Sequence, residues 1–145
     1  MKKLMPLLIL SLFVCSSAFA GSFSLETLKQ ESRKALSGNV NIVSESQDDG
    51  AASVAYSQGE SNFQFTLSSD KQSQMPSEKK ITIAGRKAEF FRPMGESSGG
   101  LFIPLENNSG SLVVIIMNGM FSDDVVTSDA LKKKVEKMDL SLFDK

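Results

Sequence analysis

The chain has 145 residues, a formal net charge of −1, no histidine and a single cysteine. This length fits one domain of common size with one hydrophobic core. A surface that is not basic has no net attraction for nucleic acid, and the composition excludes histidine-based catalysis and disulfides within the chain.

Residues 1–20 have the pattern of a secretory signal peptide. Lys2 and Lys3 precede the apolar run 7–14, and Ala18-Phe19-Ala20 matches the A-x-A pattern of a signal-peptidase site. The run is shorter than the roughly 20 residues that a membrane-spanning helix needs. We therefore expect cleavage near Ala20 and a soluble bacterial protein, periplasmic or secreted, without a transmembrane anchor.

Removal of the signal would leave residues 21–145 as a single α+β domain. The 16 Lys and Arg residues less Lys2 and Lys3 are 14, against 17 acidic residues, so the formal charge becomes −3. Cys15 leaves with the signal, and the Val14 before it does not suit a lipobox. We expect neither lipidation nor thiol chemistry of the exported chain.

The first element predicted after the signal is an amphipathic helix over residues 25–37. Its apolar residues share one face at helical spacing: Leu25, Leu28, Ala35 and Leu36. Ser24 is placed to cap the start of this helix, and Gly38 supplies a left-handed stop.

From Asn39 the apolar period changes to two, which indicates strands with one buried side. The alternating residues are Val40 and Ile42, Val54 and Tyr56, Phe63, Phe65 and Leu67, and then Ile81 and Ile83. Turn-forming residues at 46–50 and 57–61 separate the first three strands, and Gly85 turns a second hairpin. The polar stretch 68–80 predicts a long surface loop. Strands joined by short turns should be antiparallel.

Two more strands and a helix complete the predicted domain. Residues 112–117, which pair with 101–105, are apolar throughout and indicate a central strand covered on both faces. Ser128 is placed to cap a last helix with one apolar stripe, formed by Leu131, Val135 and Met138. We expect an α+β fold, with a mainly antiparallel sheet of about six or seven strands and an N-terminal and a C-terminal helix packed on it. This order of elements resembles the layout of small PsbP-like proteins.

The stretch Gly95-Glu96-Ser97-Ser98-Gly99 has the G-x-S-x-G spacing of a serine-hydrolase nucleophile elbow and resembles the G-E-S-[AS]-G-G stretch of carboxylesterases. Such a serine needs a histidine base and a long helix after it, whereas this chain has no histidine and places Pro104 soon after the motif. We interpret residues 92–100 as a mobile connection between two strands, rich in Gly and Ser because no packing demands side chains there. The sequence leaves open whether Gly95–Gly100 is a binding edge.

No cofactor and no metal site are predicted. Asp48-Asp49 and Asp123-Asp124 lack the alternating spacing of a calcium loop and indicate solvated turns. Met75, Met94, Met117 and Met120 could suit Cu(I), but methionine commonly fills cores, and that is the interpretation we adopt.

Two further patterns have a functional and a structural interpretation. Glycoside hydrolysis needs only two well-spaced carboxylates, and the candidates are Glu89, Glu96, Glu106, Asp123 and Asp124. The chain has no tryptophan and one tyrosine with which to stack a sugar ring. The run Lys132–Lys134 with Lys137 could contact anionic lipid, but helical spacing spreads these lysines over a polar face, so we expect a solvated face.

These exclusions favour a non-catalytic exported domain that binds a protein or an envelope component. The alternative hypothesis is a carboxylate-based hydrolase or a small-ligand carrier with a cleft between sheet and helix. No catalytic, cofactor-binding or metal-binding residue is assigned, and neither a specific partner nor an oligomeric state follows from the sequence.

Overall fold

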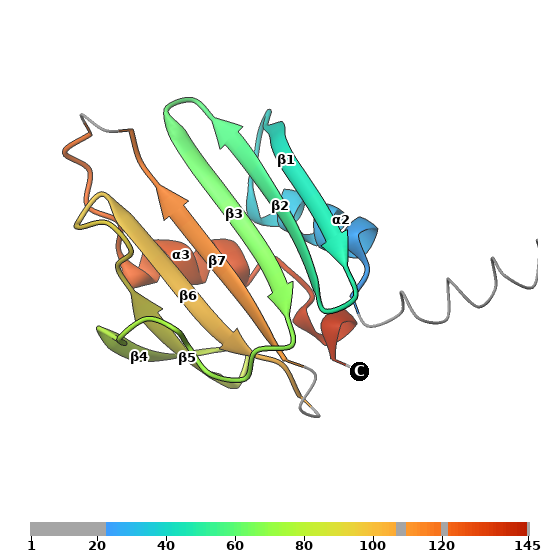
Figure 1. The fold of residues 1–145 in the computed structure, drawn as a ribbon. Helices are drawn as coiled ribbons and strands as arrows, with labels where there is room; N and C mark the ends of the chain where they lie inside the picture. Colours follow the sequence, from blue (N-terminus) through green and yellow to red (C-terminus); the bar gives the residue numbers. More distant parts are fainter. Residues whose placement is uncertain (1–22, 107–109, 120–121, 145) are drawn as a thin grey trace, which may run out of the picture.

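Seven antiparallel strands form one sheet, and two α-helices lie against one of its faces (Figure 1). The structure, a computed structural model, describes residues 23–106, 110–119 and 122–144. Its elements are α2 (Leu25–Ala35), β1 (Asn41–Asp48), β2 (Ala51–Gln58), β3 (Ser61–Ser68), β4 (Lys79–Ile83), β5 (Arg86–Phe91), β6 (Ser98–Pro104), β7 (Ser111–Met117), α3 (Ser128–Val135) and the 3-10 helix η2 (Leu140–Phe143). The predicted α+β class is confirmed. The predicted signal peptide, Cys15 and Met120 lie outside the described residues.

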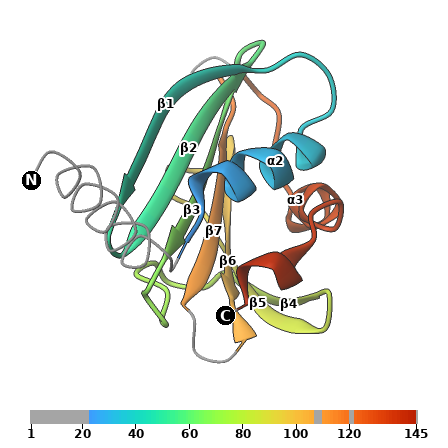
Figure 2. The same cartoon turned by 90° about the vertical axis from the view of Figure 1, so that its right-hand side faces the viewer.

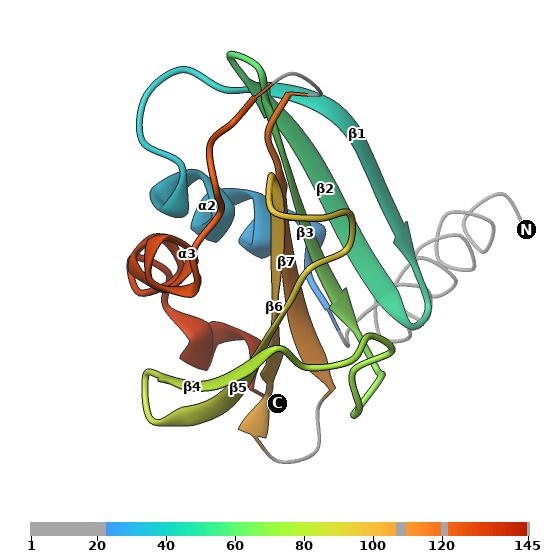
Figure 3. The same cartoon turned by 90° about the vertical axis from the view of Figure 1, so that its left-hand side faces the viewer.

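The strands lie in the order β1-β2-β3-β7-β6-β5-β4. After β3 the chain crosses to the far edge of the sheet and returns strand by strand to the middle, where β7 pairs with β3. Figures 2 and 3 show α2, α3 and η2 on one side of the sheet, which we call the inner face. Residues 69–78, the crossover segment, connect β3 to β4 over the opposite, outer face.

The inner face and the helices enclose one hydrophobic core. Alternate residues of β2, β3, β7 and β6 point into this core. They include Val54, Tyr56, Phe63, Phe65, Leu112, Val114, Leu101 and Ile103. Because side chains of a strand point alternately to the two faces, this burial confirms the period-two predictions for β2 and β3.

The N-terminal helix α2 begins where its predicted cap lies. Ser24 Oγ accepts a hydrogen bond from the backbone N–H of Thr27 at 3.2 Å. The helix ends at Ala35 rather than at residue 37, and Gly38 has a φ of +91° in the turn that follows. A 2.7 Å hydrogen bond between the hydroxyls of Ser32 and Tyr56 fixes the helix against β2.

The C-terminal helix α3 has the predicted apolar stripe but an earlier cap. Thr127 Oγ1 accepts a hydrogen bond from the backbone N–H of Ala130 at 3.1 Å. Ser128, the predicted cap, is a buried residue inside the helix, because the extended backbone ends at Thr127. The stripe Leu131, Val135 and Met138 is buried, as predicted.

A buried ion pair fastens the C-terminal segment to the sheet. Arg86 Nη1 and Nη2 donate to the two carboxylate oxygens of Asp144 at 2.7 and 2.5 Å, and the backbone N–H of Glu106 donates to the same carboxylate at 2.8 Å. Only 8% of the Arg86 side chain and 11% of the Asp144 side chain are exposed. Hydrogen bonding between the two groups lowers the pKa of Asp144 and raises that of Arg86.

Strand β1 is not the half-buried strand that the sequence predicts. All eight of its residues are exposed, including Ile42 and Val43. The reason is its place at the edge of the sheet, since α2 packs on β2 and β3 and leaves β1 uncovered. Val40, just before β1, is half-buried against the core, whereas Ile42 is exposed, so the predicted burial is right for Val40 and wrong for the strand itself.

Strand β7 occupies the centre of the sheet, as its apolar sequence predicts, but its outer side is covered at one end only. Ser111 is buried, Val113 and Ile115 are half-buried, and Met117 is exposed. The crossover segment passes over the first of these residues and not the last. The prediction that both faces of β7 are covered is thus wrong for its second half.

Candidate functional site

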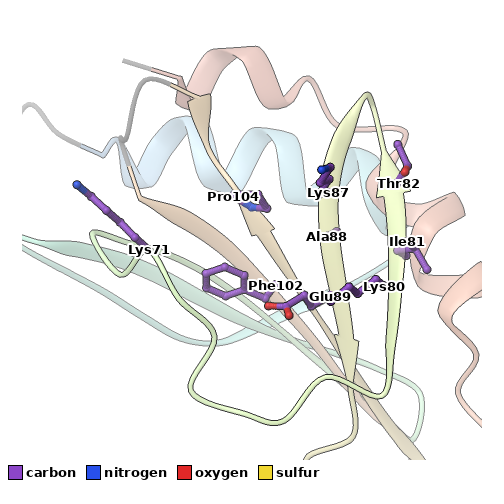
Figure 4. Close-up of a pocket in the computed structure, with 9 residues that line it drawn as sticks. All are labelled: Lys71, Lys80, Ile81, Thr82, Lys87, Ala88, Glu89, Phe102 and Pro104. Carbon is purple, nitrogen blue, oxygen red and sulfur yellow. The ribbon is translucent and has the colours of Figure 1, made fainter.

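A groove of about 550 Å³ opens on the outer face of the sheet over β4, β5 and β6. Figure 4 shows the side chains that line it: Lys71, Lys80, Ile81, Thr82, Lys87, Ala88, Glu89, Phe102 and Pro104. Phe102 and Pro104 come from β6, whereas Lys71 comes from the crossover segment. The groove thus combines an apolar β6 side with charged side chains from the hairpin and the crossover.

Strand register places the charged residues of the hairpin on the outer face. Lys80 pairs with Glu89, and Glu89 pairs with Phe102, so these three form one row across β4, β5 and β6. Thr82 pairs with Lys87 in the neighbouring row. Because directly opposite residues point to the same side of a sheet, both hairpin lysines face the groove.

The lysines of this groove have no ionic partner among the residues that the structure describes. Lys71, Lys80 and Lys87 are exposed, and none of them lies within 4.0 Å of a carboxylate oxygen in the described part of the chain. Glu89 is the one carboxylate among the residues that line the groove. Three positive charges against one negative charge make it locally basic on a protein of net negative charge, which favours an anionic ligand.

The candidate hydrolytic carboxylates come from separate segments of the fold. Glu89 lies in β5, Glu96 in the turn before β6, Glu106 after β6, and Asp123 and Asp124 between β7 and α3. No group of three or more acidic residues with the arrangement of a metal site occurs among residues 23–106, 110–119 and 122–144. Asp48 Oδ1 accepts a hydrogen bond from the backbone N–H of Gly50 at 3.0 Å, as expected of an acidic residue in a turn.

The stretch with G-x-S-x-G spacing connects two strands. Gly95 has a φ of +81°, Glu96 and Ser97 form the turn, and β6 begins at Ser98. The backbone carbonyls of Glu96 and Ser97 accept hydrogen bonds from the N–H groups of Val126 and Asn118, each at 2.9 Å. The strand-to-strand placement is confirmed, and a nucleophile elbow would need a helix at this point.

The glycines of this stretch serve packing, which corrects the expectation that no packing acts there. Gly99 and Gly100 belong to β6 and are buried. A Cβ atom on Gly99 would lie 2.6 Å from Val126 Cγ1, and one on Gly100 would lie 2.4 Å from Phe91 Cζ. The rings and methyl groups that cover this part of β6 therefore leave no room for a side chain.

Arg92 ties the same stretch to the segment before α3. Its Nη1 donates to the backbone carbonyls of Ser98 at 3.0 Å and of Val126 at 2.8 Å, and its Nε lies 2.9 Å from Glu78 Oε2. The guanidinium also lies over the ring of Phe90, with its carbon 5.0 Å from the ring centroid. The expected mobile connection is thus hydrogen-bonded on both sides.

Adjacent serines in this turn should respond differently to substitution. Ser98 is buried, donates its hydroxyl to the carbonyl of Gly95 at 2.9 Å and accepts from the N–H of Met94 at 2.8 Å. Ser98→Ala should therefore lower the free energy of unfolding by about 1–2 kcal/mol, whereas Ser97→Ala should change it by less than about 0.5 kcal/mol. Chemical denaturation measures both.

The same two variants test the hydrolase hypothesis. We expect no labelling of the parent protein or of either variant by a fluorophosphonate probe, since the chain has no histidine to take the serine proton. Stoichiometric labelling that disappears in Ser97→Ala would contradict our interpretation of the turn.

The remaining sequence candidates lie apart from the groove. Met94 and Met117 line one hollow on the outer face, while Met75 lies in the crossover segment. All three are exposed, so the expectation that they fill the core is wrong. In α3, Lys134 Nζ lies 5.5 Å from the centroid of the Phe63 ring, and Lys132 lies 3.8 Å from Glu136. Two lysines of this run therefore contact the protein itself, whereas Lys133 and Lys137 are exposed.

Comparison of the chain with protein-family models, with curated proteins and with solved structures gave no match. Within the described ranges, no helix is long and apolar enough to span a membrane. We therefore infer the function from the geometry of the groove.

Sequence reasoning missed this groove. A partial signal was present for Lys87, which stands in the predicted second hairpin. Lys80 was assigned to the surface loop 68–80, whereas the structure places it in β4, opposite Glu89. Lys71 gave no signal, since it is separated from them by a loop whose path cannot be read from its polar composition.

Proposed function

We propose that this protein is an exported, non-catalytic binding domain whose groove receives the anionic head group of an envelope lipid. The observation that carries the proposal is the convergence of Lys71, Lys80 and Lys87 on one groove without ion pairs among the described residues. The apolar side chains of Phe102 and Pro104 beside these charges suit a ligand that is both charged and apolar.

The groove lysines are more available to an anionic ligand than basic side chains that already form ion pairs. Lys29 and Lys34 already lie 3.1 and 2.6 Å from the carboxylates of Glu45 and Glu31, so a ligand would have to compete with those contacts. A lysine near an anionic membrane surface contributes about 1 kcal/mol of binding. Three such lysines on one face would contribute about 3 kcal/mol to the binding of an anionic lipid surface, and the apolar side chains beside them would add to it.

The hydrolase alternative finds less support in the groove. A two-carboxylate mechanism needs a pair of acids across the reacting bond, and Glu89 is the one carboxylate in the lining. A cleft between sheet and helix, as that hypothesis supposes, would also lie on the face opposite this groove.

Co-sedimentation with vesicles tests the proposal. We expect the protein, purified after export, to bind vesicles that contain phosphatidylglycerol and not vesicles of phosphatidylcholine alone. Replacing Lys71, Lys80 and Lys87 together by glutamine should weaken binding on the order of a hundredfold. Raising the salt concentration should weaken binding of the parent protein as well.

A charge-matched variant supplies the control. Replacing Lys132 and Lys133 of α3 and Lys137, which follows it, by glutamine removes the same formal charge from the other side of the sheet. We expect binding of this variant to stay within about twofold of the parent. Equal loss in both variants, or loss in the α3 variant alone, would contradict the assignment to the groove.

A further inference from the structure

A second cavity lies next to the groove, between the outer face of the sheet and the crossover segment. Its volume is about 170 Å³. The sheet contributes mostly apolar side chains, Phe91, Phe102, Val113 and Ile115, and the crossover segment contributes Gln72, Gln74 and Met75 among others. This volume is close to the roughly 150 Å³ of apolar cavities that admit a benzene-sized group.

One polar side chain in this cavity has no hydrogen-bond partner within the described ranges of the chain. Ser111 is fully buried, it lines the cavity, and its hydroxyl makes no hydrogen bond within the described residues. Most buried hydroxyls in folded proteins are hydrogen-bonded, so an unpaired one needs an explanation. An oxygen atom of a bound ligand would supply the missing partner.

The cavity and the groove are continuous in their lining. Phe102 lines both of them, and Ser111 pairs across the sheet with Pro104, which also lines the groove. The crossover segment likewise contributes Lys71 to the groove and Met75 to the cavity. A ligand that passes over Phe102 would thus have charged contacts at one end and apolar contacts at the other.

We propose that the cavity under the crossover segment binds the short apolar chain of a single-chain anionic amphiphile, whose charged group lies among the groove lysines with one oxygen on Ser111. This inference rests on the proposed function, because it takes those lysines as the site of the charge. It adds that the protein encloses part of its ligand instead of only touching a charged surface.

Titration with n-alkyl carboxylates tests the inference. By calorimetry we expect one octanoate per chain, with affinity rising about threefold for each methylene from butanoate upward until the cavity is full. Octanol, which has the chain without the charge, should bind at least about tenfold more weakly than octanoate. In methyl NMR spectra, octanoate should shift the signals of Val113 and Ile115.

Variants on the outer side of β7 separate the cavity from the rest of the sheet. Val113→Phe should fill the cavity and weaken octanoate binding at least about tenfold, and Ser111→Ala should weaken it about fivefold. Met117→Phe is the matched control, because it makes a similar change on the same side of the same strand outside this cavity. Its affinity should stay within about twofold of the parent. An unchanged thermal midpoint verifies that each variant is folded.

The outcomes distinguish this inference from the proposed function. Octanoate affinity that is the same in Val113→Phe and in the parent, or the absence of octanoate binding, would overturn the cavity site. The vesicle assay with the lysine variants would be unaffected by either result. Conversely, vesicle binding that ignores the groove lysines would overturn the proposed function, whatever the response of Val113→Phe.

Discussion

Asp144→Ala should destabilise the fold by about 3–5 kcal/mol, because it leaves the buried charge of Arg86 without a counter-ion. Both side chains are almost completely covered, and the Asp144 carboxylate also accepts the backbone N–H of Glu106. The loss therefore includes a hydrogen bond that fastens the C-terminal segment beside β6. Urea denaturation followed by circular dichroism measures the change.

The control for this experiment removes both charges. Arg86→Met with Asp144→Leu leaves no unpaired ion, so it should be less destabilising than Asp144→Ala alone, as for other buried pairs that are replaced by apolar residues. If the double variant were destabilised by the sum of the two single variants, the two charges would not be coupled and our account of the pair would be wrong.

The ion pair also predicts a pH dependence. The pKa of Asp144 is lowered from its ordinary value of 3.8, chiefly by hydrogen bonding to Arg86. A group whose pKa is lower in the folded state contributes stability that is complete above the unfolded value and is lost as the pH falls through the folded value. The stability difference between the parent and Asp144→Asn should accordingly be constant near neutral pH and shrink below pH 3.8.

Val135→Asp should cost at least about 3 kcal/mol, since it places a carboxylate in the core without a partner or else expels α3 from the sheet. Val135 is fully buried and lies in the same stripe as Leu131. A helix of this length is marginal in water unless its apolar face is packed, so losing the contact should also unfold the helix. Denaturation and the loss of helical dichroism measure the two effects.

Ala130→Asp is the matched control, because it introduces the same side chain at an exposed position in the first turn of the same helix. There the carboxylate is solvated and close to the positive end of the helix dipole, so the change should be within about 0.5 kcal/mol. Equal stability of the parent and Val135→Asp would show that α3 does not contribute to the core.

Predictions made from neighbouring residues in the chain were the accurate ones. Ser24 marks the start of α2 because a cap acts on backbone groups within a single helical turn. The predicted stop at Gly38 was less accurate, since the helix already ends at Ala35. The apolar stripe of α3 and the alternation in β2 and β3 likewise depend on the geometry of one element. The α+β class follows from the order of these elements.

The predictions of burial and packing were wrong where they depend on which other segment packs against an element. The sequence of β1 alternates like that of a half-buried strand, but its exposure is decided by the position of α2 over the neighbouring strands. The sequence pattern predicts that Gly100 lies in a loop, whereas the structure places it in β6 against the ring of Phe91. A local sequence pattern does not predict such contacts, because it does not specify how the two contacting segments are placed relative to each other.

The sequence by itself thus determined most elements of this protein, the N-terminal cap of α2 and the fold class, because propensity and periodicity act within a few residues. Tertiary structure alone decided the candidate site. Lys71 meets Lys80 and Lys87 only because the chain crosses the outer face between β3 and β4, and Ser111 is buried by that same crossover. The path of a long polar connection depends on which strands it joins, and strand order is set by the packing of the whole sheet.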